Sequence, residues 1–126
     1  MKKEIVSTKN APEAIGPYSQ AVKVGNFVFT AGQIAIDPET QKMVEGGITE
    51  QTERVMKNLK AILKAVGFTL MDVVKVDVFL KNLEDFASMN EIYQHFFSES
   101  KPARTTVAVS DLPKGALVEI SLIAAK

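Results

Sequence analysis

Arginine is rare in this chain of 126 residues, because thirteen of its fifteen basic residues are lysine. Arg54 has a local partner in Glu50, four residues away on the polar face of a predicted helix. Arg104 has no such neighbour and begins a β-prone segment after Pro102. Its planar guanidinium can grip a carboxylate through two parallel hydrogen bonds, which a lysine ammonium cannot do. Arg104 is therefore a candidate carboxylate clamp, with a surface arginine at a strand end as the alternative.

Glu119 is the second candidate, because it is the only charged residue between positions 116 and 125. Strand alternation places its side chain on the face opposite Ile120 and Leu122. A single carboxylate in an apolar strand either faces solvent or serves a site as an acid or a base. The pattern leaves both interpretations open, and it does not show whether the strands of Arg104 and Glu119 are neighbours.

Three further residues are suited to a binding site. Tyr18 follows Gly16-Pro17, a tight turn that can present the ring at the edge of a pocket. Gly32 ends a strand, where its backbone can approach a ligand closely. Asn90 lies near a helix start and can bond a ligand, although such turns favour asparagine anyway. The only histidine, His95, is predicted on a solvated helix face rather than in catalysis.

The composition excludes several classes of chemistry and of partner. Without cysteine there are no disulfides, thiolate nucleophiles or Cys-type zinc sites, and one histidine cannot make a His-rich metal site. Fifteen acidic residues balance the fifteen basic ones, so the charge gives no sign of binding to nucleic acid or to an anionic membrane. We therefore expect no metal site and no nucleic-acid partner.

The size and patterning are those of one globular domain over residues 1–126, with 46% hydrophobic and 24% charged residues. The N-terminus lacks the apolar stretch of a signal peptide, and no apolar run approaches the ~18 residues that span a membrane. We expect a cytoplasmic protein.

The local patterns predict an α+β domain. Strand-like runs occupy residues 20–24, 27–31, 73–80, 104–109 and 117–124. Gly25-Asn26 joins the first two in a hairpin. Helical spacing of apolar residues predicts one helix over 49–66 and another that begins at Asn82 or Ser88 and ends at Pro102. This order predicts a single domain with one mixed sheet and two main helices on one face.

The strands carry apolar residues on both faces. Val74, Val76 and Val78 are predicted on one side of their strand, with Val73 and Phe79 on the other. Two helices can cover only one face of a sheet of five or six strands, so the second apolar face needs a partner. We predict a homo-oligomer closed by symmetry, with coverage by long loops as the alternative.

Six short stretches along nearly the whole chain form a distinctive set. They are Asn10-Ala11-Pro12, the run from Ala14 to Ala21, Gly32-Gln33-Ile34, Val76-Asp77-Val78-Phe79-Leu80, Pro102-Ala103-Arg104 and Val118-Glu119-Ile120. Their order and spacing resemble those of the reactive-intermediate (Rid, YjgF-like) imine deaminase family. The resemblance implies a chorismate-mutase-like fold and a homotrimer with active sites in the clefts between subunits.

The resemblance also implies an activity, the hydrolysis of 2-imino acids to 2-keto acids and ammonia. These substrates, typified by 2-iminobutanoate and 2-iminopropanoate, are released with their enamine tautomers by pyridoxal-phosphate enzymes. The family arginine matches Arg104, which would clamp the substrate carboxylate. The family glutamate matches Glu119, which would position and activate water.

Other family positions match with two departures. Tyr18 matches a catalytic tyrosine, while Gly32 and Asn90 match positions that bind the substrate. Many members have a serine where this chain has Ala31, and a cysteine where it has Thr106. The cysteine position contributes largely through its backbone, so Thr106 is expected to preserve the substrate-binding pocket. The missing hydroxyl at Ala31 bears on substrate preference more than on activity.

This chemistry needs no cofactor. An imine carbon is already electrophilic, and more so when protonated, so its hydrolysis requires no metal or covalent nucleophile. The protein must hold the carboxylate, place a water about 3 Å from the carbon and transfer protons. The expected partners are a small 2-imino acid and further copies of the same chain.

Two other functions stay open at this point. A non-catalytic small-acid-binding or chaperone-like protein would use the same cleft without turnover. An RNA-directed translation inhibitor is the third possibility, because that activity is also attached to the family. Arg104 favours deamination over ligand binding alone, and the neutral charge with scattered lysines weighs against RNA.

Overall fold

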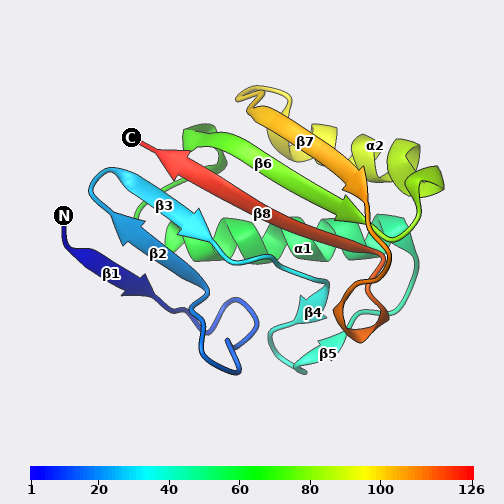
Figure 1. The fold of residues 1–126 in the computed structure, drawn as a ribbon, viewed down its shortest axis with the longest axis horizontal. Coiled ribbons are helices and arrows are strands. Elements are labelled where there is room, and N and C mark those ends of the chain that lie inside the picture. The colour runs from blue at the N-terminus through cyan, green and yellow to red at the C-terminus, as the bar shows by residue number, and fades with distance from the viewer.

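A six-stranded sheet forms the frame of the computed structural model, which describes all 126 residues (Figure 1). In spatial order its strands are β1 (Lys3–Val6), β2 (Ala21–Val24), β3 (Phe27–Thr30), β8 (Val118–Ala125), β6 (Val73–Leu80) and β7 (Ala103–Ala108). Strands β6 and β7 are parallel, and every other neighbouring pair is antiparallel. The predicted mixed sheet is confirmed. Strand β6 separates the strands that carry Arg104 and Glu119.

Helices α1 (Ile48–Lys64) and α2 (Phe86–Phe97) lie on the same face of the sheet, as the order of elements predicts (Figure 1). At the start of α1, the N–H of Gly47 donates to the Glu50 carboxylate at 2.8 Å. After its end, Gly67 adopts a left-handed φ of 78°, which stops the helix as predicted. Neither helix is long and apolar enough to cross a membrane.

Of the two predicted starts for the second helix, Asn82 agrees with the structure and Ser88 does not. Asn82 precedes a 3-10 turn, η2 (Leu83–Asp85), and α2 follows it directly. Ser88 therefore lies inside the helix, and the predicted start at that residue is wrong. Because the chain is already helical at Phe86, the N–H groups near Ser88 need no cap. Two further 3-10 turns are η1 (Leu70–Asp72) and η3 (Pro113–Gly115).

Three short strands were not predicted. Strand β1 buries only Val6 of its four residues, so it carries no alternating pattern. Strands β4 (Ile36–Asp37) and β5 (Lys42–Met43) form a separate two-stranded ribbon beside α1. Strands this short contain too few residues for a period of two to be recognised.

The core lies between the sheet and the two helices, in one cluster of 22 buried residues. On β6 the core-facing residues include Val73, Val76 and Val78, whereas Val74 is 47% exposed. The prediction that Val74 shares a face with Val76 is wrong, because a register shift between Val73 and Lys75 inserts one extra residue. Such a bulge reverses the alternation on one side of it.

The other face of the sheet is not covered by loops. Phe27 and Phe29 on β3 are 45% and 44% exposed, and their ring centroids lie 6.2 Å apart. Phe29 pairs in register with Val22 on β2 and with Ile123 on β8, which extends the apolar row across three strands. The uncovered apolar face that the sequence predicts is present in the structure, and the alternative of covering loops is wrong.

Candidate active site

Arg104 lies on the edge strand β7, with its side chain on the face that the helices cover. Its Cα pairs in register with that of Val76, which is fully buried in the core. Paired residues on neighbouring strands point to the same face of a sheet. The backbone therefore directs the guanidinium toward α2, the helix that connects β6 to β7.

One face of α2 holds this guanidinium through an amide and two aromatic rings. Nη1 of Arg104 donates a hydrogen bond to Oδ1 of Asn90 at 2.6 Å. Its Cζ lies 4.6 Å from the ring centroid of Tyr93 and 5.4 Å from that of Phe86, both within the range of a cation–π contact. Phe86, Asn90 and Tyr93 follow one another at intervals of four and three residues, so they share one side of the helix.

The guanidinium keeps most of its donors free. It has five N–H donors, and one of them, on Nη1, is bonded to Asn90. All three ion pairs of the molecule lie elsewhere and involve lysines. A cavity of about 680 Å³ opens beside it, which we call the Arg104 pocket. It is lined by Asn90, Tyr93, Gln94, Phe97, Ser98, Lys101, Pro102 and Arg104.

Among the buried hydroxyl groups that have no hydrogen-bond partner, two belong to β7 and to the face of α2 that meets it. One is the Oγ1 of Thr106, which lies two residues beyond Arg104 on the same face of β7. The other is the hydroxyl of Tyr93. Burial raises the pKa of Tyr93, and this effect is larger than the opposing influence of nearby Arg104. The phenol is therefore neutral at physiological pH and can donate a hydrogen bond.

Glu119 lies on the central strand β8 and faces away from the helices. Its neighbours Val118 and Ile120 are fully buried, whereas Glu119 itself is partly buried, so the predicted alternation is confirmed. Burial raises the pKa of the Glu119 carboxyl above its ordinary value, because no positive group offsets the loss of hydration. A carboxyl group with a raised pKa can exchange protons closer to neutral pH.

Gly32 packs its backbone directly against this carboxylate. A Cβ atom at Gly32 would come within 2.9 Å of Cδ of Glu119, a distance that real Cβ atoms do not show. The next residue, Gln33, bridges to Ile120 through two backbone hydrogen bonds of 2.8 and 3.1 Å, which fixes this approach. The close approach predicted for Gly32 is therefore made to Glu119 within the chain.

A cleft of about 620 Å³ surrounds the carboxylate, and we call it the Glu119 cleft. Besides Glu119 and Gly32, its lining includes Tyr18, Ala31 and Lys114. Tyr18 is 55% exposed and lies at the edge of the cleft. The cleft therefore combines one carboxyl group, one phenol and backbone surface around an open space.

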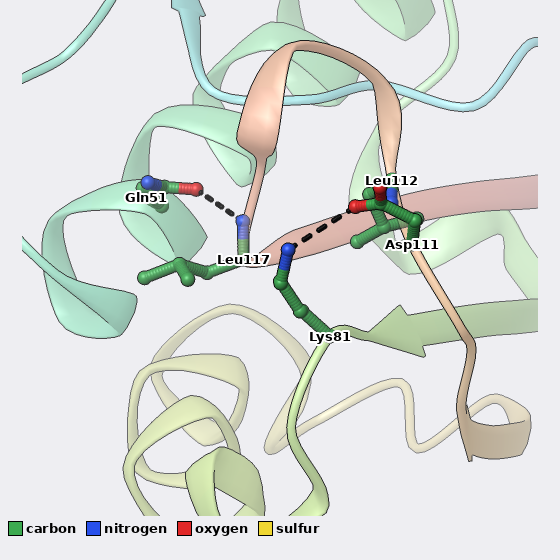
Figure 2. Close-up of polar contacts among 5 residues, drawn as sticks. All are labelled: Gln51, Lys81, Asp111, Leu112 and Leu117. Atoms are coloured by element: carbon green, nitrogen blue, oxygen red, sulfur yellow. Dashed lines mark hydrogen bonds and ion pairs between the residues drawn. The ribbon is translucent and has the colours of Figure 1, made fainter.

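The loop between β7 and β8 borders the Glu119 cleft and is fastened on both sides (Figure 2). Nζ of Lys81 contacts Oδ1 of Asp111 at 3.1 Å, and Oε1 of Gln51 on α1 accepts the N–H of Leu117 at 2.9 Å. The backbone N–H of Leu112 and Lys81 together lower the pKa of Asp111. These contacts hold Lys114, in a left-handed conformation with φ 55°, at the border of the cleft.

The predicted site residues fall into two groups on opposite faces of the sheet. Asn90, Arg104 and Thr106 belong to the helix-covered side, and Tyr18, Gly32 and Glu119 to the open side.

Arg104 and Glu119 pair with different residues of β6, namely Val76 and Phe79. Across the sheet, their strands lie two strand spacings of about 4.8 Å apart. Along the strands, the two residues are offset by three residues of about 3.3 Å each, so their Cα atoms lie about 14 Å apart. One chain therefore does not bring both groups to the same side of a small molecule.

The aromatic part of the Arg104 pocket was not predicted. Neither Tyr93 nor Phe86 is among the predicted site residues. The helical spacing of both rings from Asn90 was the signal that could have placed them beside this predicted binding residue. His95, by contrast, is exposed on α2, as predicted. No three His, Cys, Asp or Glu side chains lie close enough together to hold a metal ion.

Comparison with known proteins identifies similar sequences and folds. Residues 8–126 match the family described as Endoribonuclease L-PSP. A RutC family protein of Pyrococcus abyssi is 61% identical over 126 residues, covering 100% of this chain and 99% of its own. A 2-iminobutanoate/2-iminopropanoate deaminase of Dermatophagoides farinae is 47% identical over 121 residues, covering 96% and 94%. The crystal structure of a Rid family protein of unknown function from Yersinia pestis superposes with a TM-score of 0.97 at 46% identity, covering 99% and 100%.

Proposed function

This chain belongs to the Rid family, the family of the endoribonuclease L-PSP and RutC proteins, and we propose that it hydrolyses 2-imino acids to 2-keto acids and ammonia. The deaminase name of the Dermatophagoides farinae relative, 47% identical over nearly the whole chain, supports this substrate class.

The observation that carries the proposal is the state of Arg104. Its guanidinium is held by Asn90 and two aromatic rings, has no acidic partner and faces a cavity. A fixed cation with free parallel donors is complementary to a carboxylate. A 2-imino acid carries a carboxylate next to its reactive carbon, so binding there would position that carbon.

Glu119 is proposed to manage the protons. Water adds to the carbon of the imine, whose nitrogen is protonated. The Glu119 carboxylate accepts a proton from that water, which gives a carbinolamine. The carboxylic acid then returns the proton to the amine nitrogen. As the C–N bond breaks and ammonia leaves, the Glu119 carboxylate accepts the proton of the carbinol hydroxyl, which gives the 2-keto acid, and that proton passes to the departing ammonia or to solvent. The raised pKa of Glu119 suits both directions of this transfer.

We propose that a neighbouring copy completes each site. Arg104 and Glu119 lie on opposite faces of one sheet, so a second chain must bring its Glu119 cleft to the Arg104 pocket. The exposed row around Phe27 and Phe29 offers the surface for such an assembly. A closed ring of three copies, each giving one half-site to the next, satisfies every half-site and matches the family expectation.

The other site residues have roles that follow from their places. Tyr18, at the edge of the Glu119 cleft, would join the catalytic group when the neighbour closes the site. Gly32 keeps space for the Glu119 carboxylate, Asn90 orients Arg104, and the free hydroxyl of Thr106 would bond the substrate.

The activity is tested by generating 2-iminobutanoate in situ and measuring its disappearance. We expect the chain to accelerate hydrolysis and Arg104→Lys to lower kcat/KM about 10- to 100-fold, because an ammonium cannot form the bidentate contact. Arg54→Lys is the matched control, since Arg54 also donates to an asparagine, Oδ1 of Asn58, at 3.0 Å. Wild-type rates in Arg104→Lys would refute the carboxylate clamp, and binding of a 2-keto acid without turnover would show a binding protein.

The shared site is tested by complementation. Arg104→Lys and Glu119→Gln chains are each expected to lose most of their activity, to about a tenth of wild type or less. When both are co-expressed in equal amounts, about a quarter of the shared sites combine an intact Arg104 from one chain with an intact Glu119 from the other. Recovery toward a quarter of wild-type activity would support the shared site, and no recovery in mixed assemblies would refute it.

A further inference from the structure

We infer that Tyr93 is a second carboxylate-binding residue of the Arg104 pocket: its ring supports the guanidinium, and its hydroxyl donates a hydrogen bond to the bound carboxylate. This inference rests on the proposed function, because it takes the substrate carboxylate to be the ligand of this pocket.

The ring of Tyr93 is well placed to orient the guanidinium. Tyr93 is 7% exposed, and the Cζ of Arg104 lies 4.6 Å from its centroid, closer than to the ring of Phe86. Phe97 supports the ring from the next turn, with centroids 4.7 Å apart and planes tilted by 42°. The ring therefore has little freedom to move away, and Arg104 is confined between it and Asn90.

The hydroxyl of Tyr93 has no role in the isolated chain. It is buried, its O–H has no acceptor within the chain, and Tyr93 belongs to the residues that line the Arg104 pocket. A buried phenol usually finds a hydrogen-bond partner, since burial removes its hydration. If the side chain served packing alone, phenylalanine would fill the same space without that loss. The free hydroxyl therefore points to a ligand.

The chemistry of that ligand follows from the two groups. The guanidinium and the neutral phenol lie close to one another, and neither the O–H of Tyr93 nor the remaining N–H groups of Arg104 have an acceptor within the chain. Converging free donors are satisfied by an anion with two acceptor oxygens. A carboxylate fits this arrangement, with one oxygen bound by the guanidinium fork and its partner also accepting from Tyr93.

The chain is favourable for a direct test, because it has two tyrosines and no tryptophan. Protein labelled with ¹³C at the tyrosine Cζ gives two resonances, which Tyr93→Phe and Tyr18→Phe variants assign. We expect the Tyr93 resonance to shift when 2-ketobutanoate is added, because a new hydrogen bond changes the electron density at Cζ. An unmoved Tyr93 resonance under saturating 2-ketobutanoate would overturn the inference.

Affinity and turnover separate the ring from the hydroxyl. Tyr93→Phe should weaken 2-ketobutanoate binding about three- to tenfold and raise KM similarly, with kcat nearly unchanged, because one hydrogen bond to a non-reacting group is lost. Tyr93→Leu should also lower kcat, because the guanidinium loses its support. Phe96→Leu, a partly buried aromatic of α2 outside the pocket, controls for helix stability.

The outcomes distinguish this inference from the proposed function. If Arg104→Lys abolishes 2-ketobutanoate binding while Tyr93→Phe binds it within twofold of wild type, the inference is overturned and the clamp stands. If Arg104→Lys leaves binding unchanged, the proposed function fails and the inference fails with it. Because Tyr93→Phe keeps the ring and its packing, a folding failure of Tyr93→Leu does not affect either conclusion.

Discussion

The Arg104 side chain is oriented by other side chains, whereas the Glu119 side chain is oriented by backbone. Arg104 is oriented by an amide and two rings that project from one helix. Glu119 is oriented by a glycine that leaves it space and by a backbone bridge beside it. Substitutions that remove side-chain atoms should therefore disturb the Arg104 pocket, whereas substitutions that add atoms should disturb the Glu119 cleft. In the proposed reaction the pocket binds the substrate and the cleft transfers the protons.

The largest expected effect is that of Glu119→Gln, which tests this division of roles. Glutamine keeps the size of the side chain but cannot accept a full proton, so kcat should fall about 10²- to 10⁴-fold. Binding of 2-ketobutanoate should stay within twofold, because it belongs to the Arg104 pocket. Steady-state kinetics and calorimetry on the same preparation measure both quantities.

Glu13→Gln is the matched control for that experiment, because Glu13 lines the same cleft but is exposed. An unchanged kcat in Glu119→Gln would remove Glu119 from the mechanism. A parallel loss of turnover and of 2-ketobutanoate binding would make Glu119 a substrate ligand. The division of roles between the Arg104 pocket and the Glu119 cleft would then be wrong.

A smaller effect is expected from Gly32→Ala, which adds one carbon atom beside the Glu119 carboxylate. The carboxylate must move away, so kcat should fall about 10- to 100-fold while KM changes little. Gly47→Ala is the control, because a Cβ at Gly47 meets nothing within 4 Å. If Gly32→Ala raised KM and spared kcat, the cleft rather than the pocket would carry substrate binding.

The smallest effect concerns stability. Burial raises the pKa of Glu119 in the folded chain, so folding is most favourable when this group is protonated. Wild-type stability should fall as pH rises from the ordinary glutamate value of 4.5 toward the raised value. Glu119→Gln lacks this loss, so its free energy of unfolding should exceed that of wild type at neutral pH and approach it at low pH. Denaturant unfolding of both proteins at neutral and at low pH measures the difference in their free energies of unfolding. An equal difference at the two pH values would contradict burial of the charged Glu119 carboxylate as its cause.

Where a pattern is local, the sequence predicted the structure well. The spacing of apolar residues in α1, the Gly25 turn and the alternation around Glu119 all follow from neighbours along the chain. The bulge after Val73 was missed and the start of α2 was left open between Asn82 and Ser88, because both depend on how these segments pack against the rest of the molecule.

The candidate site was predictable as a set of residues but not as an arrangement. The resemblance pointed to Arg104 and Glu119, yet their separation depends on the order of the strands, and no residue pattern states that β6 lies between them. Tyr93 was not predicted as a site residue, because the sequence alone does not distinguish an aromatic ring that packs in the core from one that contacts Arg104.

The order of the strands also has a consequence for how the molecule folds. The Arg104 pocket depends on β6, α2 and β7, which follow one another along the chain, and its contacts close only short loops. The Glu119 cleft depends on the bridge between Gln33 and Ile120, which joins distant parts of the sequence. Closing a long loop costs more chain entropy and delays the contact that requires it. We therefore expect the Arg104 pocket to form from local contacts, and the Glu119 cleft to be completed only when β8 enters the sheet.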